Sequence, residues 1–200
     1  MSKTKIKYIC SNCGYESLRW IGKCPECESW NSFTEEIVET SSRKANISKS
    51  RFSYSKILDI SANEDDRIKT GIIEFDRVLG GGIMPGSVIL LGGDPGIGKS
   101  TIAMQAAASI KEKVLYVTGE ESEKQIKLRS SRLKVKSDSF FVQAETELSN
   151  IFGAIKEIAP SVVIIDSIQT TYRSELENSP GTITQIRECA AMLMEEAKKN

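Results

Sequence analysis

An octapeptide at Gly93–Ser100, GDPGIGKS, sets the narrowest limits on the fold of this chain. It matches the pattern G-x-x-x-x-G-K-S/T at every fixed position, which is the pattern of a loop that binds the phosphates of a nucleoside triphosphate. The apolar segment SVILL at 87–91 precedes the loop, and an alanine-rich segment at 100–111 follows it. We therefore expect a buried strand, the loop and a helix in succession, and these flanks disfavour the alternative of a chance glycine-rich turn.

The residues of this loop have distinct expected roles. Glycines let the backbone turn its N–H groups inward, where they and the helix N-terminus bind phosphate oxygens. Lys99 is expected to reach the β- and γ-phosphates in catalysis, and the Ser100 hydroxyl is expected to ligate Mg²⁺. The predicted ligands are ATP and Mg²⁺, and the predicted binding residues are Gly93, Asp94, Pro95, Gly96, Ile97, Gly98, Lys99, Ser100 and Thr101.

Two acidic residues at predicted strand ends are candidates for the same site. The segment 161–170, SVVIIDSIQT, is an apolar strand that ends in Asp166, and we predict that this carboxylate lies on the Mg²⁺ side. An acidic turn after a core strand is the alternative. The strand 114–117 leads to Glu120 and Glu121, at the edge where parallel strands line a ligand crevice. Glu120 is predicted to orient the attacking water, and Glu121 competes for this role or begins the next helix.

Segments of strand and helix character alternate along the rest of the chain. Further strands are expected at 114–117, 140–142 and 161–165, and helices at 121–133, 148–158 and 182–199. This alternation predicts an α/β fold with a mostly parallel sheet and helices on both faces. Gln169 and Thr170, just past the Asp166 strand, are expected near the γ-phosphate. Only four strands are found, and sheets of this type usually continue, so we expect the chain to be part of a longer protein.

Four of the five cysteines form two C-x-x-C pairs, Cys10/Cys13 and Cys24/Cys27, separated by ten residues. This spacing is typical of a tetrahedral thiolate site, and metal binding would supply the folding free energy of so small a module. Zn²⁺ is the favoured ion, iron in a rubredoxin-like site is the alternative, and a pair of redox dithiols is disfavoured. Cys189 stands alone in the last helix and is expected to be a buried structural thiol.

Two tryptophans accompany the cysteines. Trp20, Lys23 and Trp30 form either a contact surface for nucleic acid or protein, or the module's own small core, and the sequence leaves both open. We divide the chain into a zinc module at 1–33, a linker rich in Ser, Thr, Lys and Glu at 34–66, and an ATPase domain at 67–200. In the linker, the short run 57–60 is a candidate for docking onto a neighbour.

Composition excludes a few classes of protein. The formal net charge is zero, so the totals give no bulk attraction to nucleic acid or to a membrane surface. No apolar run approaches the roughly 20 residues that span a bilayer, and the N-terminus lacks a signal-peptide pattern. We therefore expect a cytoplasmic protein without membrane partners, in which paired cysteines bind metal rather than form disulfides.

These motifs together carry a resemblance to a known family. A four-cysteine module, then the block TGIIEFDRVLGGGIMPGSVILLGGDPGIGKST, then YVTGEES and VVIIDSIQT resemble the RadA (Sms) family of bacterial DNA repair proteins, among the wider RecA-like ATPases. The resemblance implies a RecA-like core and a DNA-dependent ATPase of homologous recombination. It also implies binding of single-stranded or branched DNA, helicase-like branch migration, a homo-oligomeric ring that is a hexamer in the family, and a recombinase or helicase partner.

The resemblance also assigns roles to residues. Glu120 matches the water-activating glutamate, Asp166 the Mg²⁺-side aspartate, and the four cysteines the zinc ligands. A DNA-contacting loop is implied over Tyr172–Arg187, with Arg173 and Arg187 as its basic candidates, although acidic residues lie between them. Members of the family continue with a lysine-asparagine-arginine-phenylalanine-glycine motif and a domain resembling Lon-type proteases. Neither is found in this sequence, so hydrolysis and DNA unwinding by the chain alone are not implied.

Two alternatives to a DNA motor remain open at this point. One is a regulatory RecA-like ATPase whose cysteine module binds a protein and which does not act on DNA. The other is a structural zinc protein with a vestigial loop, which a loss of nucleotide binding on Lys99→Ala would exclude.

Overall fold

The computed structural model describes residues 4–39, 56–59 and 66–199. The chain forms two compact units, Met1–Asn63 and Glu64–Asn200. In the first unit β1 (Thr4–Cys10) lies between β2 (Glu16–Ser17) and β3 (Phe33–Glu39), and both neighbours are antiparallel to it.

The boundary predicted between the cysteine module and the linker is wrong. Residues 34–39 begin the stretch predicted to be a linker from its content of Ser, Thr, Lys and Glu, yet they belong to β3, which pairs with β1 from Cys10↔Phe33 to Thr4↔Glu39. A strand at the edge of a small sheet tolerates charged side chains, because its backbone groups are paired on one side only. A single turn of 3₁₀ helix, Ile57–Asp59, exposes Ile57 and Leu58, and the rest of the predicted linker lies outside the described residues.

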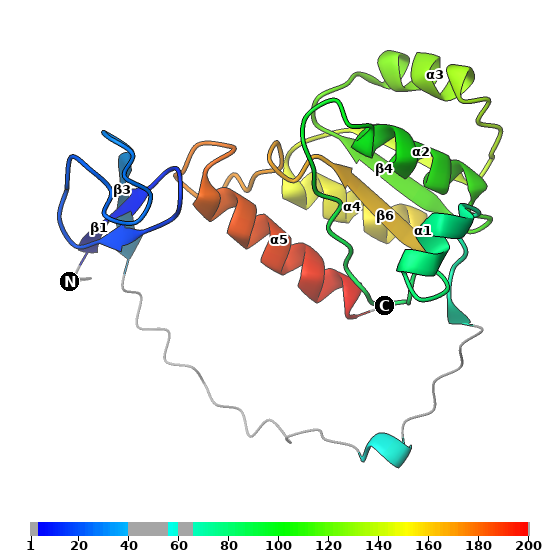
Figure 1. Ribbon diagram of the computed structural model, residues 1–200, viewed down its shortest axis with the longest axis horizontal. Coiled ribbons are helices and arrows are strands. Elements are labelled where there is room, and N and C mark those ends of the chain that lie inside the picture. Colours follow the sequence, from blue (N-terminus) through cyan, green and yellow to red (C-terminus); the bar gives the residue numbers. More distant parts are fainter. Residues whose placement is uncertain (1–3, 40–55, 60–65, 200) are drawn as a thin grey trace. The chain divides into compact units, whose positions relative to one another are not determined.

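The second unit alternates helices and strands (Figure 1). Its elements are α1 (Ile73–Val78), α2 (Lys99–Ser109), β4 (Val114–Thr118), α3 (Glu123–Arg132), β5 (Phe140–Ala144), α4 (Leu148–Ile158), β6 (Val162–Asp166) and α5 (Ile183–Ala197). The three strands form a parallel sheet in the order β5-β4-β6. Within the described residues, no helix combines the length and apolar character that crossing a bilayer requires.

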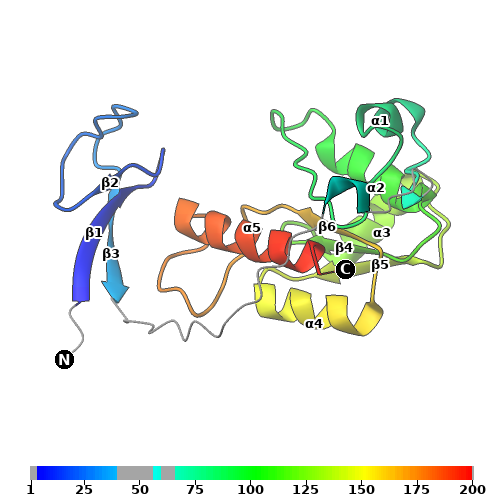
Figure 2. The same cartoon turned by 90° about the horizontal axis from the view of Figure 1, so that it is seen from below.

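The predicted parallel sheet with helices on both faces is confirmed. Side chains of the fully buried central strand β4 alternate between two cores. Val114 and Tyr116 pack against α2 and α3, whereas Leu115 and Val117 pack against Ile151 of α4. Figure 2 shows α4 on one side of the sheet and α1, α2 and α3 on the other. This arrangement fixes β4 and β6 firmly, so the residues that follow their carboxyl ends have defined positions.

The strand predicted at 87–91 is not formed. These residues are not hydrogen-bonded into the sheet, and Leu90 keeps 86% of its surface exposed. An apolar run identifies side chains that favour burial, but a strand also needs a neighbour that pairs with its backbone. Among the described residues the sheet has β5, β4 and β6 only, and none of them pairs with this segment.

The helix boundaries follow local capping signals. The Ser122 hydroxyl accepts a hydrogen bond from the Gln125 N–H, and the Gln125 side chain accepts one from the Ser122 N–H. This reciprocal capping box begins α3 two residues later than predicted, so Glu121 lies in the turn before the helix. The helix α4 spans the predicted residues 148–158, and its C-cap Ala159 adopts a left-handed conformation.

Candidate functional site

Glu120 and Asp166 lie at the ends of adjacent strands. Thr118 of β4 is opposite Asp166 of β6 in the parallel register, and the Gly119 N–H donates to the Asp166 carbonyl oxygen at 3.0 Å. The Ser167 hydroxyl then donates to Oε1 of Glu120 at 3.1 Å. The structure thus brings together two of the predicted catalytic carboxylates at the carboxyl edge of the sheet.

The packing of α2 sets the direction in which the phosphate loop lies. Met104 contacts Tyr116 of β4, while Ala107, further along the helix, and Ile110, which follows the last helical residue, contact Val114. The helix therefore runs opposite to β4, and its first residue, Lys99, lies toward the carboxyl end of the strand. This is the same edge of the sheet at which Glu120 and Asp166 lie.

The loop before α2 fits a phosphate group. Gly96 and Gly98 have φ angles of 79° and 102°, in the left-handed region, and a side-chain carbon added at either would meet no atom within 4 Å. No side chain caps the N-terminus of α2. Its first backbone N–H groups and the open space beside the glycines suit an anion, as expected of a nucleotide site.

Lys99 folds back over its own loop. Its ammonium group donates to the carbonyl oxygens of Gly93 at 2.7 Å and Asp94 at 2.9 Å. Binding of a triphosphate would require the ammonium to exchange these carbonyls for phosphate oxygens. Ser100 and Thr101 follow in the first turn of α2, in the order that the motif requires, and Asp94, Pro95 and Ile97 form the exposed outer part of the loop.

The two adjacent glutamates have different environments. The Glu121 carboxylate forms an ion pair of 2.5 Å with Nη1 of Arg129, and its backbone N–H donates to the Thr118 hydroxyl. Glu120 has the Ser167 hydroxyl as its neighbour and no cation paired with it among the described residues. This difference supports Glu120 as the base that faces water, because Glu121 is already held by an arginine.

Thr170, expected near the γ-phosphate, lies directly behind the end of β4. Its hydroxyl donates to the Ser167 carbonyl oxygen at 2.8 Å, and it leaves no room for a side chain on Gly119. Gln169 is exposed beside it. The structure thus places Thr170 as a packing partner of the turn that carries Glu120.

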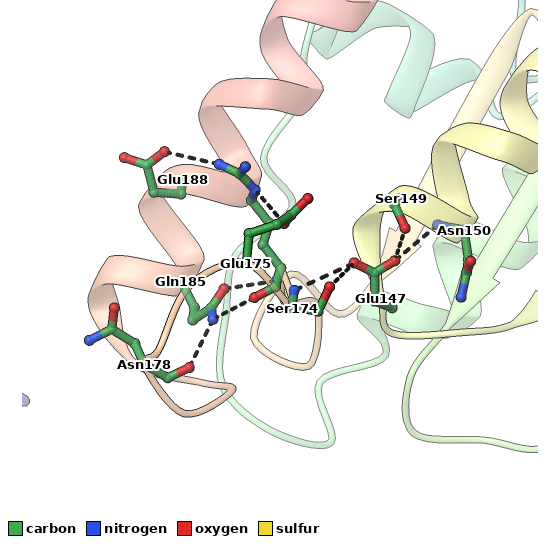
Figure 3. Close-up of polar contacts among 9 residues, drawn as sticks. Glu147, Ser149, Asn150, Ser174, Glu175, Asn178, Gln185 and Glu188 are labelled. Atoms are coloured by element: carbon green, nitrogen blue, oxygen red, sulfur yellow. Dashed lines mark hydrogen bonds and ion pairs between the residues drawn. The ribbon is translucent and has the colours of Figure 1, made fainter. Parts of the chain in front are cut away.

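The segment after β6, where a DNA-contacting loop was expected, is held by two buried side chains (Figure 3). Glu147, the N-cap of α4, accepts hydrogen bonds from Asn150 and Ser149 of its own helix and from the hydroxyl of Ser174. Gln185 of α5 pairs with the backbone N–H and carbonyl of Arg173 at 2.9 and 3.1 Å. Sequence reasoning missed both residues, because buried polar side chains give no periodic signal.

The two basic candidates in this segment differ in accessibility. The Arg173 guanidinium lies 3.4 Å from the Glu175 carboxylate and 3.6 Å from that of Glu188, and it is largely buried. Arg187 is exposed on α5. Arg187 is therefore the cation that a phosphate could reach without displacing a carboxylate. Cys189 is fully buried in the same helix, as predicted, and burial raises the pKa of its thiol.

The four cysteines of the first unit converge. Their sulfur atoms all lie within 4.8 Å of one another, with Cys10 3.6 Å from Cys27 and Cys13 3.5 Å from Cys24. A tetrahedral site with metal–sulfur bonds of about 2.3 Å has sulfur atoms about 3.8 Å apart. The four thiols therefore fit one tetrahedral ion.

The chemistry of the thiols agrees with this geometry. Hydrogen bonds with Ser29 and Asn12 lower the pKa of Cys27 to about 5. The Tyr15 N–H favours the Cys13 thiolate, but burial and the neighbouring sulfur atoms outweigh it and raise the pKa of Cys13 to about 12. Thiolates this close cannot all ionise beside one another, so a dication would relieve their repulsion.

Both tryptophans of this unit face solvent. Trp20 is 55% exposed and Trp30 72% exposed, whereas the small core is formed by Cys10, Cys24 and Phe33. Lys23 pairs with the carboxylate of Glu28 at 3.1 Å. Of the two interpretations left open by the sequence, the tryptophans therefore belong to the surface and not to the module's core.

Comparisons with known proteins agree with both units. A family model described as "Rubredoxin metal binding domain" matches residues 8–35, and an ATPase model described as KaiC matches residues 68–152. With the parallel sheet and the phosphate loop, these matches define a RecA-type ATPase domain that follows a zinc-ribbon fold.

Similar proteins extend the match over nearly the whole chain. The DNA repair protein RadA of Halalkalibacterium halodurans is 48% identical over 209 residues, which are 99% of this chain and 45% of that protein. RadA of Bacillus subtilis is 48% identical over 206 residues, again 99% of this chain, and RadA of Listeria monocytogenes 44% over 207 residues, or 98%. The chain belongs to the RadA family of RecA-like ATPases. It spans 44–45% of the length of these relatives.

Proposed function

We propose that the protein is a DNA-dependent ATPase that acts in homologous recombination and DNA repair. The observation that carries the proposal is the convergence of Glu120, Asp166 and the amino end of α2 at one edge of the sheet. The similarity to proteins named DNA repair protein RadA connects this site with DNA. The reaction is hydrolysis of ATP to ADP and phosphate.

In this proposal each site residue has one task. The loop Gly93–Thr101 binds the triphosphate through its N–H groups, and Lys99 neutralises charge on the β- and γ-phosphates. Bound Mg²⁺ would supply positive charge that neutralises the negative charge developing on the phosphates. Ser100 and Asp166 are the residues that would hold it. Glu120 orients a water molecule and accepts its proton. Its carboxylate is available for this task because it accepts a hydrogen bond from Ser167 and is paired with no cation among the described residues.

We also propose that the DNA ligand is single-stranded or branched and that the protein assembles as a homo-oligomeric ring, a hexamer, for helicase-like branch migration. Arg187 on α5 is the first candidate for a phosphate contact, because it is exposed, while Arg173 is paired with two carboxylates. Zn²⁺ is the proposed ion of the four-cysteine site. A recombinase or helicase is the proposed protein partner.

The test is ATP turnover with and without single-stranded DNA at two salt concentrations. Stimulation should be lost as salt rises, because phosphate contacts release counterions. Arg187→Gln should lower the affinity for DNA and make that affinity less dependent on salt, by the equivalent of about one phosphate contact. Lys156→Gln, at an exposed position of α4, should change neither quantity. Unchanged turnover on DNA addition, with no retention of the protein on DNA, would contradict the proposal.

A second candidate function is favoured by the exposed aromatic residues of the first unit. A RecA-like regulatory ATPase would use Trp20 and Trp30 to contact a protein, and its turnover would not respond to DNA. The same turnover measurement separates the two functions. A response to DNA that persists in the double variant Trp20→Ala/Trp30→Ala would assign the DNA contact to the second unit.

A further inference from the structure

A polar cluster lies directly beneath the proposed Mg²⁺ side of the site. Tyr116 is in the middle of β4 and fully buried, yet its hydroxyl group donates a hydrogen bond to Oδ2 of Asp166. The same hydroxyl oxygen accepts a hydrogen bond from Nη2 of Arg129 at 3.0 Å. A tyrosine, and not a purely apolar residue, therefore connects the core of the sheet with the catalytic edge.

Arg129 of α3 joins both strand ends. Its side chain is only 17% exposed, and its guanidinium pairs with Glu121 through Nη1 at 2.5 Å while Nη2 lies 3.9 Å from Oδ2 of Asp166. One cation thus faces two carboxylates, one after β4 and one at the end of β6. Burying an arginine has a cost, which is visible in its Nε atom, since that atom is buried without a hydrogen-bond partner.

The two carboxylate oxygen atoms of Asp166 have different surroundings. Oδ2 is held by Tyr116 and faces Arg129, whereas Oδ1 has no partner among the described residues. The phenol oxygen of Tyr116 accepts a hydrogen bond from Arg129, and the phenol's own proton is directed at Asp166. The phenol therefore acts as a hydrogen-bond donor that fixes the orientation of the carboxylate.

We propose that Tyr116 and Arg129 are positioning residues of the nucleotide site. They hold Oδ2 of Asp166 so that Oδ1 is directed to the Mg²⁺ side, and Arg129 holds Glu121 so that the preceding Glu120 stays at the strand end. This inference rests on the proposed ATPase function. It adds two residues that lie behind the predicted site residues, one in the centre of β4 and one in α3.

The test measures how much Mg²⁺ is needed for binding of a fluorescent ATP analogue. Tyr116→Phe removes only the hydroxyl and keeps the ring packed on Phe140, so the variant should fold. The Mg²⁺ concentration for half-maximal binding should rise about tenfold, while binding at saturating Mg²⁺ is retained. Arg129→Met should raise this Mg²⁺ concentration at least as far. Arg129→Lys should raise it less than Arg129→Met, because lysine keeps the positive charge but lacks the planar guanidinium group.

Arg132→Met is the matched control, since Arg132 is an exposed arginine one turn along the same helix. It should leave the Mg²⁺ titration unchanged. If the wild-type protein binds no nucleotide in response to Mg²⁺, the proposed ATPase function fails. If the wild type titrates normally and Tyr116→Phe titrates like Arg132→Met with an unchanged melting temperature, the positioning role is wrong.

Discussion

Two neighbouring glutamates, Glu120 and Glu121, have the same chemistry in the sequence and different surroundings in the structure. The sequence places both at the end of a strand and predicts the water-orienting role for Glu120, with Glu121 as the competing candidate. The ion pair between Glu121 and Arg129 separates them, and it depends on how α3 packs, which no local pattern encodes. The phosphate loop was easier to predict, because its glycines and lysine act through a fixed local spacing.

Replacing Glu120 by glutamine should slow ATP hydrolysis by about 100-fold or more and leave ATP binding unchanged, because the amide no longer accepts a proton from water. Turnover and equilibrium binding measured on the same preparation would show the split. Glu123→Gln, an exposed acid in the first turn of α3, is the control and should keep full turnover. If Glu121→Gln alone gave the loss of turnover with binding retained, the water-orienting role would pass to Glu121.

The turn that carries Glu120 depends on close packing behind it. A side-chain carbon on Gly119 would lie 2.0 Å from the Thr170 hydroxyl oxygen and 2.8 Å from a methyl group of Thr146. Gly119→Ala should therefore destabilise the protein by about 1–3 kcal/mol, because the β6–α5 connection must move. Thermal unfolding would measure the change.

A matched glycine supplies the control for this substitution. Gly153 lies in the exposed face of α4, and an added carbon there meets nothing within 4 Å. Gly153→Ala should raise stability by up to about 1 kcal/mol, since alanine favours helix. Equal melting temperatures for the two alanine variants would contradict the packing described at Gly119.

Element boundaries could be predicted where local chemistry decides them, as at α4 and at strands β4 and β6. The segment 87–91 shows the limit of such prediction, because its apolar residues are correctly recognised while pairing depends on a neighbouring strand. The strand at 34–39 shows the opposite case, where a polar sequence is a strand because β1 pairs with it. Glu147 and Gln185 could not be found at all, since each acts on a backbone segment distant in sequence.

Glu147 should make the segment after β6 sensitive to acid. Burial opposes ionisation of its carboxyl, but hydrogen bonds from Ser149, Asn150 and Ser174 outweigh burial and hold its pKa below the ordinary 4.5. Because the pKa of Glu147 is lower in the folded than in the unfolded protein, its carboxylate stabilises the fold fully above about pH 4.5. This stabilisation is lost as the pH falls through the pKa of the carboxyl group in the folded protein.

Glu147→Gln should therefore cost about 1–3 kcal/mol at pH 7 and speed hydrogen exchange of the Asn150 and Ser174 amides. The difference in unfolding free energy from the wild type should shrink below pH 4. Glu157→Gln, on the exposed face of α4, should do neither. A wild-type minus variant difference that is constant from pH 7 to pH 3 would refute the role of the carboxylate.

The two units of the chain draw their stability from different sources. The second unit has an apolar core on each face of its sheet, whereas the first has a small cluster around Cys10, Cys24 and Phe33. The first unit should therefore need its metal ion to fold. Cysteine spacing and hydrophobic alternation are both local signals, so the difference between a cysteine-rich module and a domain with an apolar core could be expected from the sequence, whereas the boundary at residue 33 could not.

Chelation of zinc, or the double variant Cys10→Ser/Cys13→Ser, should unfold the first unit and leave nucleotide binding by the second unchanged. Circular dichroism and tryptophan fluorescence would follow the first unit, since Trp20 and Trp30 are the chain's only tryptophans. Nucleotide affinity measured in parallel would follow the second. A loss of affinity on zinc removal would show that the two units are energetically coupled.

The most direct test of the whole account is equilibrium binding of Mg·ATP to the wild-type protein and to Lys99→Ala. The wild type should bind saturably, with one ATP per chain. The variant should bind at least about 100-fold more weakly, because it lacks the ammonium group. In the wild type this group would leave the carbonyl oxygens of Gly93 and Asp94 and bind phosphate oxygens instead. Equal affinities for the two proteins, or no binding by the wild type, would contradict a nucleotide site at Gly93–Thr101.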